Sequence, residues 1–208
     1  WKASFFLFAY AGAFSYGYLS LETGVGALVL FGAVQITMIL VGFLKGDRFN
    51  CIEWFGVAAA FFGFIYLVAP NISTPSVSGF ILMSIAGVAW GFYTLIGRGA
   101  IAPLLDTSFN FLRTLPFIAV LVLFTYQNYS ISPEGLLLAA LSGGLTSGVG
   151  YAIWFLALGG LSSIQASVVQ LLVPVLAAIG GVIFSYETIS LHLIISSSVV
   201  LGGVLIVL

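Results

Sequence analysis

Polar side chains within long apolar stretches are the residues of this chain that could do chemistry. Arg113 is a full positive charge inside such a stretch, and with Asp106 and Asn110 it forms an i, i+4, i+7 stripe on one helix face. An arginine at the centre of a bilayer costs at least about 2.5–3.5 kcal/mol, so it usually faces protein or water. Two interpretations stay open: contact with a substrate or gate, or an anchor that reaches back to the lipid headgroups.

Amide side chains mark two further apolar stretches. Gln170 shares a helix face with Ser167 and Pro174, and Pro174 removes a backbone donor and frees a carbonyl one turn earlier. Gln35 lies in an earlier stretch, one turn after Phe31. A buried amide in a membrane helix needs a partner, either another helix or a bound ligand, and both remain open.

Aromatic residues with polar tips complete the candidate set, either as the lining of a cavity or as plain packing. The candidate substrate-binding residues are Phe31, Gln35, Trp90, Tyr93, Asn110, Arg113, Tyr151, Trp154, Ser167 and Gln170. We expect no metal or cofactor, because Cys51 and His192 each stand alone without metal-ligand spacing. We also expect no enzyme, because Ser147 falls near mid-membrane and His192 at the outer surface, too far apart for a hydrolase.

Composition limits the class of protein. Charged residues make up 5% and hydrophobic residues 62% of the 208 residues, whereas a soluble domain has roughly 25% charged residues. The net charge of −1 gives no basis for a nucleic-acid partner. We expect an all-α integral membrane protein whose partners are the lipid bilayer and a small-molecule metabolite, with a homodimer left open.

Eight stretches are long enough to cross a hydrocarbon layer of about 30 Å, which takes roughly 20 helical residues. Their apolar runs are continuous, and backbone groups in lipid must be paired within the segment, so we predict helices. The predicted spans are Ala3–Ser20, Gly24–Leu44, Glu53–Ala69, Ser78–Gly97, Thr107–Tyr126, Glu134–Leu158, Ser163–Ser185 and Ser190–Leu208.

Basic residues outside the spans predict the orientation. Lys2, Lys45, Arg48 and Arg98 all flank spans on the same side, and the opposite loops contain no Lys or Arg. The positive-inside rule makes the basic side cytoplasmic. We therefore predict that both ends of this chain lie in the cytoplasm.

A faint repeat relates residues 18–68 to residues 158–208, an offset of 140 residues that pairs Asp47 with Glu187 and Gly63 with Gly203. Five spans separate each segment from its copy, and because five is odd the second copy is inverted. The spans beginning at Ser78 and Thr107 have no earlier partner, so we expect roughly 60 to 75 further residues before the chain. The whole would have ten helices in two inverted five-helix repeats, with residues 1–70 ending the first repeat and residues 77–208 forming the second.

Several short motifs resemble the EamA family of the drug/metabolite transporter superfamily, and the similarity runs from that family's third helix to its tenth. The motifs are KGDRF at 45–49, WFG at 54–56, AWGFY at 89–93 with Arg98, FLR at 111–113, and Pro174 followed by Glu187. Asp47 stands where the family usually has Glu. The resemblance implies two inverted halves around a central cavity. It also implies movement of small metabolites, often amino acids, across a bacterial plasma membrane by alternating access and commonly outward.

The mechanism we expect is a rocking of the two halves around a cavity lined by the spans that begin at Ala3, Gly24, Ser78, Glu134 and Ser163. No carboxylate lies deep in a span, which favours exchange or facilitated efflux over an acidic proton relay. The alternative function is a non-transporting membrane scaffold or assembly subunit. Its signature would be an outward-facing stripe of small residues and no continuous polar cavity.

Overall fold

The computed structural model describes residues 1–69, 76–125, 131–184 and 189–208, and they are helical apart from short turns and loops. Glu187, one partner in the predicted repeat, lies outside these residues. The helices are α1 (Lys2–Gly17), α2 (Thr23–Leu44), α3 (Cys51–Val68), α4 (Val77–Gly97), α5 (Pro103–Thr125), α6 (Pro133–Ala140), the π-helix η3 (Leu141–Val149), α7 (Gly150–Leu158), α8 (Ser163–Val169), α9 (Leu172–Phe184) and α10 (Leu191–Val207). The all-helical prediction is confirmed.

Within the described residues, six helical segments are long and apolar enough to cross a membrane. Two of them are composite, because α6, η3 and α7 form one segment and α8 with most of α9 forms another. Helix α10 is a shorter apolar helix of 17 residues, and α1 has 16 residues. Each of the eight predicted spans therefore corresponds to a helix or to a run of consecutive helices.

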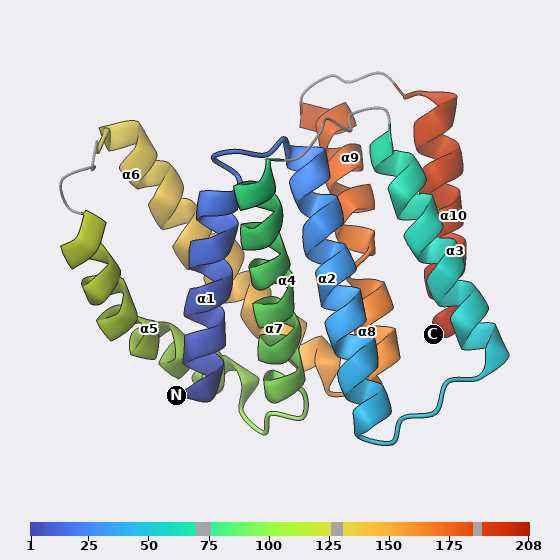
Figure 1. Cartoon of the computed structure of the whole chain (residues 1–208), viewed down its shortest axis with the longest axis horizontal. Helices are drawn as coiled ribbons and strands as arrows, with labels where there is room; N and C mark the ends of the chain where they lie inside the picture. Colours follow the sequence, from blue (N-terminus) through green and yellow to red (C-terminus); the bar gives the residue numbers. More distant parts are fainter. Residues whose placement is uncertain (70–75, 126–130, 185–188) are drawn as a thin grey trace.

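The helices stand side by side, with α1, α4 and α2 adjacent and the α3–α10 pair at one edge (Figure 1). The start of α1, the loop from α2 to α3 and the loop from α4 to α5 all lie at the lower end in this view. Lys2, Lys45, Arg48 and Arg98 belong to these segments. The basic residues outside the spans are thus gathered at one end of the bundle.

Local chemistry determines where the helices at this end stop and start. Helices α2 and α4 are each followed within two residues by a glycine with positive φ, 93° at Gly46 and 84° at Gly99. Such left-handed glycines terminate helices because a side chain there would be strained. Helix α3 then begins with a capping box, in which Asn50 and Glu53 each accept a hydrogen bond from the other's backbone N–H at 2.8 Å.

The helix boundaries repeat at the predicted offset. A shift of 140 residues moves the bounds of α2, Thr23 and Leu44, onto Ser163 and Phe184, the start of α8 and the end of α9. The same shift moves the first residue of α3 onto Leu191, the first residue of α10. Figure 1 shows α8–α9 running opposite to α2, and α10 opposite to α3. The repeated helices are therefore inverted.

The contact between α3 and α10 is itself repeated. A Cβ on Gly63 would lie 2.9 Å from the backbone nitrogen of Val200, and a Cβ on Gly203 would lie 2.4 Å from that of Ala60. Gly63 corresponds to Gly203 at the 140-residue offset, and Ala60 corresponds to Val200. The two contacts are equivalent under the repeat, so a glycine on each helix lets the two backbones approach closely.

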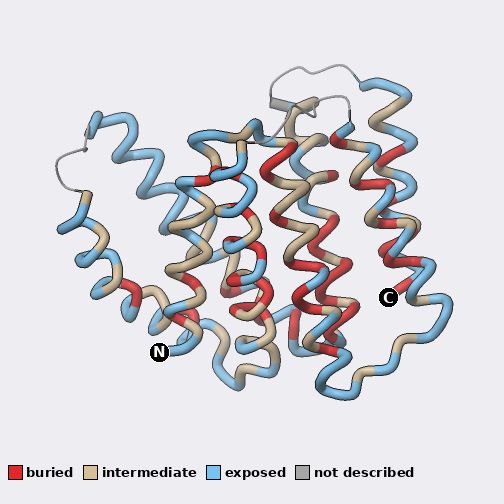
Figure 2. Tube along the Cα trace, in the orientation of Figure 1, coloured by how far each residue is buried: buried red, intermediate tan, exposed pale blue. Residues whose placement is uncertain are grey.

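Burial is uneven across the bundle (Figure 2). Helices α2, α3, α8 and α10 carry many buried residues, whereas α6 and η3 have none. Helix α4 is also well covered, with eight buried residues, so the covered part of the molecule includes α4 between α1 and α2 as well as the region where α2 and α3 meet α8 and α10.

Candidate functional site

A break divides the span after Ser163 into α8 and α9. Pro174 has no backbone N–H, so the carbonyl of Gln170 cannot receive the usual helical hydrogen bond from four residues ahead. It accepts instead from the N–H of Val173 at 3.1 Å. Interrupted helices of this kind commonly form the binding sites of membrane transporters.

The same break frees the carbonyl of Ser167, because the N–H of Leu171 turns to the carbonyl of Val168 at 2.9 Å. The freed oxygen accepts a hydrogen bond of 3.2 Å from Nε2 of Gln35 on α2. Both Gln35 and Ser167 are buried. A side chain from the first predicted repeat therefore supplies a hydrogen bond that the broken helix of the second repeat does not make within itself.

The side-chain oxygen and nitrogen of Gln170 are both hydrogen-bonded. Its Oε1 accepts a hydrogen bond from Nε1 of Trp90 on α4. Its Nε2 donates to the carbonyl of Ala166 at 3.0 Å and to Sδ of Met38 at 3.2 Å. The break between α8 and α9 is thus fastened to both α4 and α2, and in this conformation Gln170 has no free polar atom.

Aromatic rings from three helices surround Trp90. Its ring centroid lies 4.7 Å from that of Tyr10 on α1, 4.9 Å from Tyr151 on α7 and 5.7 Å from Tyr93 on α4. Tyr93 meets Phe155 edge to face at 5.0 Å. These five residues, which we call the aromatic cluster, form a layer between the broken helix and the lower end of the bundle.

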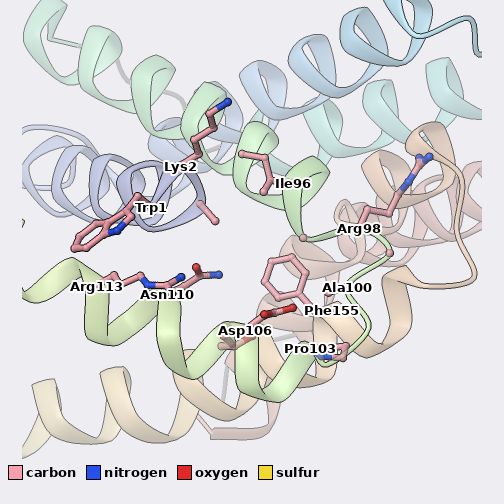
Figure 3. Close-up of a pocket in the computed structure, with 14 residues that line it drawn as sticks. Trp1, Lys2, Ile96, Arg98, Ala100, Pro103, Asp106, Asn110, Arg113 and Phe155 are labelled. Carbon is pink, nitrogen blue, oxygen red and sulfur yellow. The ribbon is translucent and has the colours of Figure 1, made fainter.

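A pocket of about 460 Å³ opens at this lower end (Figure 3). Lys2, Arg98, Arg113 and Asp106 all line it, so three of the five Lys and Arg residues of the chain meet at one cavity. The remaining lining residues are Trp1, Ala3, Ile96, Gly97, Gly99, Ala100, Pro103, Thr107, Asn110 and Phe155. The predicted stripe of Asp106, Asn110 and Arg113 lies along this pocket.

Asn110 connects the pocket with the aromatic cluster. Its Oδ1 accepts a hydrogen bond of 3.3 Å from the buried Ser4 of α1, which leaves its Nδ2 group as a donor. The Tyr93 side chain lies near Asn110, yet the buried Tyr93 hydroxyl has no hydrogen-bond partner among the described residues. The buried Thr107 hydroxyl, one turn before Asn110, has none there either.

Arg113 has its guanidinium carbon 5.4 Å from the ring centroid of Phe109, the geometry of a cation–π contact. Among the described residues no carboxylate lies within 4.0 Å of Arg113. Arg98 behaves differently, because its guanidinium donates to Oγ of Ser163. Figure 3 shows Arg98 turned away from the pocket and Arg113 beside Asn110.

The structure brings most of the predicted site residues into one connected region. Trp90, Tyr93, Tyr151 and Trp154 pack in a single buried cluster with Phe155. Gln35, Ser167 and Gln170 adjoin it at the break, and Asn110 and Arg113 adjoin it at the pocket.

One predicted residue departs from this arrangement. Phe31 packs edge to face on Phe64 of α3, with ring centroids 5.8 Å apart, in the core between α2, α3 and α10. Trp154 joins the aromatic packing, but its buried Nε1 has no hydrogen-bond partner within the described part of the chain.

Four residues of this region were not predicted as site residues from the sequence: Ser4, Tyr10, Thr107 and Phe155. Ser and Thr in an apolar stretch usually bond their own helix, and single aromatic residues usually pack, so neither type signals a site. The nine-residue π-helix η3 was also missed, although its sequence LSGGLTSGV contains three glycines. Long π segments are rare and often occur at functional sites.

Ser147 and His192, the two residues that a hydrolase would need close together, have different surroundings. Nε2 of His192 lies 2.7 Å from the carbonyl oxygen of Tyr66, and the two rings pack at 4.4 Å on the α3–α10 side. Ser147 instead lines a separate pocket of about 340 Å³ between α1, α5 and η3.

Fold and site together define a helical, multi-pass membrane protein with inverted halves and a polar, aromatic interior. The profile of the EamA-like transporter family matches residues 77–208. The chain belongs to this family, and it is a membrane transporter.

Similar proteins include two that are named as transporters. The chain is 45% identical to an uncharacterized protein of Pseudomonas aeruginosa, over all of this chain and 72% of that protein. It is 20% identical to the uncharacterized transporter YoaV of Bacillus subtilis, over 94% of this chain and 70% of that protein. An uncharacterized transporter of Archaeoglobus fulgidus is 26% identical over 80% of this chain and 61% of its own length.

The fold also matches a crystal structure with a TM-score of 0.80 at 18% sequence identity, covering 99% of this chain and 73% of the other. At this identity the match concerns the fold alone.

Proposed function

We propose that the protein moves small metabolites across the bacterial plasma membrane by alternating access, as an exporter or exchanger. The observation that carries the proposal is the hydrogen bond from Gln35 to the carbonyl of Ser167. It joins inverted halves at a broken helix, the place where transporters of this architecture bind substrate. A conformational change that separates α2 from α8 would expose both groups to a ligand.

The proposed path runs from the pocket at Asn110 and Arg113, past the aromatic cluster, to Gln170 and Gln35. Its polar groups lie at its two ends, and aromatic rings lie between them. In the conformation seen here the path is closed, because Tyr93 is fully buried and Gln170 is 5% exposed. We take this as a state open toward the basic end of the bundle, which the positive-inside rule assigns to the cytoplasm.

A polar pocket weighs against the scaffold alternative. Small residues do serve close packing here, since a Cβ on Gly87 would lie 2.4 Å from the carbonyl oxygen of Leu30. A scaffold, however, has no need for a cavity lined by Asp106, Asn110 and Arg113. Exchange or facilitated efflux remains the form of transport we propose, because Asp106 stands at the first turn of α5 rather than deep in the bundle.

The proposal is tested with a metabolite panel in cells that make or lack the natural full-length protein. Intracellular and extracellular metabolites are measured over time by mass spectrometry. We expect one small group of compounds to accumulate inside cells that lack the protein and to leave cells that make it. A Gln35→Leu, Gln170→Leu double variant, matched for the amount of folded protein in the membrane, is the control. Identical profiles with and without the natural protein across the panel would refute transport of the compounds tested and favour a scaffold.

A further inference from the structure

We infer that the pocket between α1, α4, α5 and α7 is a carboxylate-binding site, and that the substrates are therefore small molecules with a single carboxylate. The inference rests on the transport function proposed above and adds the chemical class of the substrate. It is carried by three side chains on one face of α5, namely Thr107, Asn110 and Arg113.

Asn110 and Arg113 present hydrogen-bond donors to the cavity. Ser4 occupies the oxygen of the Asn110 amide, which leaves Nδ2 to donate. Arg113 offers a planar set of N–H groups with no carboxylate partner among the described residues. Such a group matches the two oxygens of a carboxylate, and charge-assisted hydrogen bonds of this kind are the strong ones.

Thr107 supplies independent support, because its side chain is 3% exposed and lines the pocket. A helical threonine commonly bonds the carbonyl one turn earlier, but the Thr107 hydroxyl has no partner within the described residues. A buried hydroxyl without a partner is costly. A carboxylate beside Asn110 and Arg113 would lie about one turn from this hydroxyl, which is covered in this conformation and would pair with the ligand once its side chain turns toward the cavity.

Asp106 limits the charge that the site accepts. Its carboxylate lines the same pocket, seven residues before Arg113, which is roughly 10 Å of helical rise. Figure 3 shows Asp106 at the Phe155 end of the pocket and Arg113 at the Trp1 end. A monoanion can sit at the Arg113 end, whereas a second negative charge on the ligand would approach Asp106. The arrangement favours a monocarboxylate over a doubly charged phosphate ester.

The experiment measures binding to the purified natural protein in detergent, by thermal unfolding at increasing ligand concentration and constant ionic strength. Four probes of matched chain length differ in the head group: butyrate, butyramide, butylamine and butyl phosphate. We expect butyrate to raise the unfolding temperature with a saturating dependence, and the other three to have little effect. Equal shifts for butyrate and butyramide, or a larger shift for butyl phosphate, would overturn the carboxylate assignment.

Two variants connect the effect with the named residues. Arg113→Gln is expected to weaken butyrate binding roughly tenfold to a hundredfold, because a charge-assisted hydrogen bond is lost. Thr107→Val keeps the shape of the side chain and should weaken binding roughly two- to tenfold. Arg48→Gln removes the same charge from the exposed loop after α2 and should leave binding unchanged. Unaltered butyrate binding in both pocket variants would overturn the site.

The outcome is separable from that of the proposed function. Absence of butyrate binding in a protein that still exports metabolites would remove the carboxylate site and keep transport. Butyrate binding that requires Arg113, in a protein that exports nothing, would keep the site and count against transport.

Discussion

The indole nitrogen of Trp90 on α4 donates a hydrogen bond to the side-chain oxygen of Gln170, at the break between α8 and α9. Trp90 also packs on Tyr93, whose hydroxyl has no hydrogen-bond partner among the described residues and lies near Asn110. Helix α4 therefore contacts the broken helix at Trp90 and lines the basic pocket with Ile96 and Gly97, about two turns further along. A ligand that engages Asn110 on α5 would lie close to Tyr93 of α4, the helix that also binds Gln170.

Replacing Trp90 with Phe keeps an aromatic ring in the cluster but removes the donor, so Oε1 of the buried Gln170 loses its partner. We expect stability in detergent to fall by about 1 kcal/mol. The additional change Gln170→Leu removes the unpaired oxygen, so the double variant should lose less than the sum of the two single variants. A coupling of roughly 0.6–2 kcal/mol in a double-mutant cycle measures the bond. Strict additivity would show that the two side chains do not interact in the membrane.

Gln170→Leu alone should affect transport more than folding. Leucine suits a membrane helix, and a lost side-chain hydrogen bond between such helices costs on average only about 0.6 kcal/mol, so the amount of folded protein in the membrane should hold. The initial rate of transport per folded molecule should drop if the amide contacts substrate after α2 and α8 separate. Rates are measured in vesicles, with protein quantified in the same preparation. An unchanged rate would leave Gln170 as a structural residue only.

The sequence predicted the helices well because continuous apolar runs encode them locally. The runs of α2 and α4 end just before Gly46 and Gly99, and the run of α3 begins after its capping residue Asn50. The offset of 140 residues also predicted the correspondence of α2 with α8–α9. Pro174 indicated the missing backbone hydrogen bond at Gln170, since the chemical cause lies within the same segment, but the span was predicted to be one continuous helix.

Contacts between helices were harder to predict. Gln35 and Gln170 were both expected to need partners, but nothing local indicates that Gln35 meets a carbonyl 132 residues away or that Trp90 meets Gln170. The rotation of each helix against its neighbours determines these pairs. For the same reason Phe31 fell on the core side with Phe64.

Adjacent glycines of α10 offer a matched test of the α3–α10 crossing. A Cβ on Gly203 would lie 2.4 Å from the Ala60 nitrogen, whereas one on Gly202 meets nothing within 4 Å in the described part of the chain. We expect Gly203→Ala to destabilise the protein by roughly 1–3 kcal/mol through overpacking. Gly202→Ala should be neutral or slightly stabilising, since alanine favours a helix over glycine. Chemical unfolding in mixed micelles compares the two, and equal stabilities would contradict the close crossing.

Cys51 reports the orientation. It is an exposed cysteine at the start of α3, next to the loop that contains Lys45 and Arg48. The positive-inside rule predicts that this loop is cytoplasmic. A membrane-impermeant maleimide should leave Cys51 unlabelled in intact cells and modify it after permeabilisation, and a Cys51→Ser variant provides the background. Labelling in intact cells would reverse the proposed topology, including the side on which the basic pocket opens.

Arg113→Lys separates a binding role from a membrane anchor. Lysine keeps the positive charge and also reaches the headgroups, so an anchor predicts near-normal transport. Lysine lacks the planar array of N–H groups, so a carboxylate held by Arg113 and Asn110 would bind more weakly. We expect KM for transport to rise about tenfold, the effect of losing roughly 1.4 kcal/mol of binding, while the amount of folded protein stays constant. Arg98→Lys is the matched comparison, because Arg98 binds Ser163 and turns away from the pocket, and it should change KM far less. If both variants keep the natural KM, Arg113 is an anchor over Phe109 and the path must begin elsewhere.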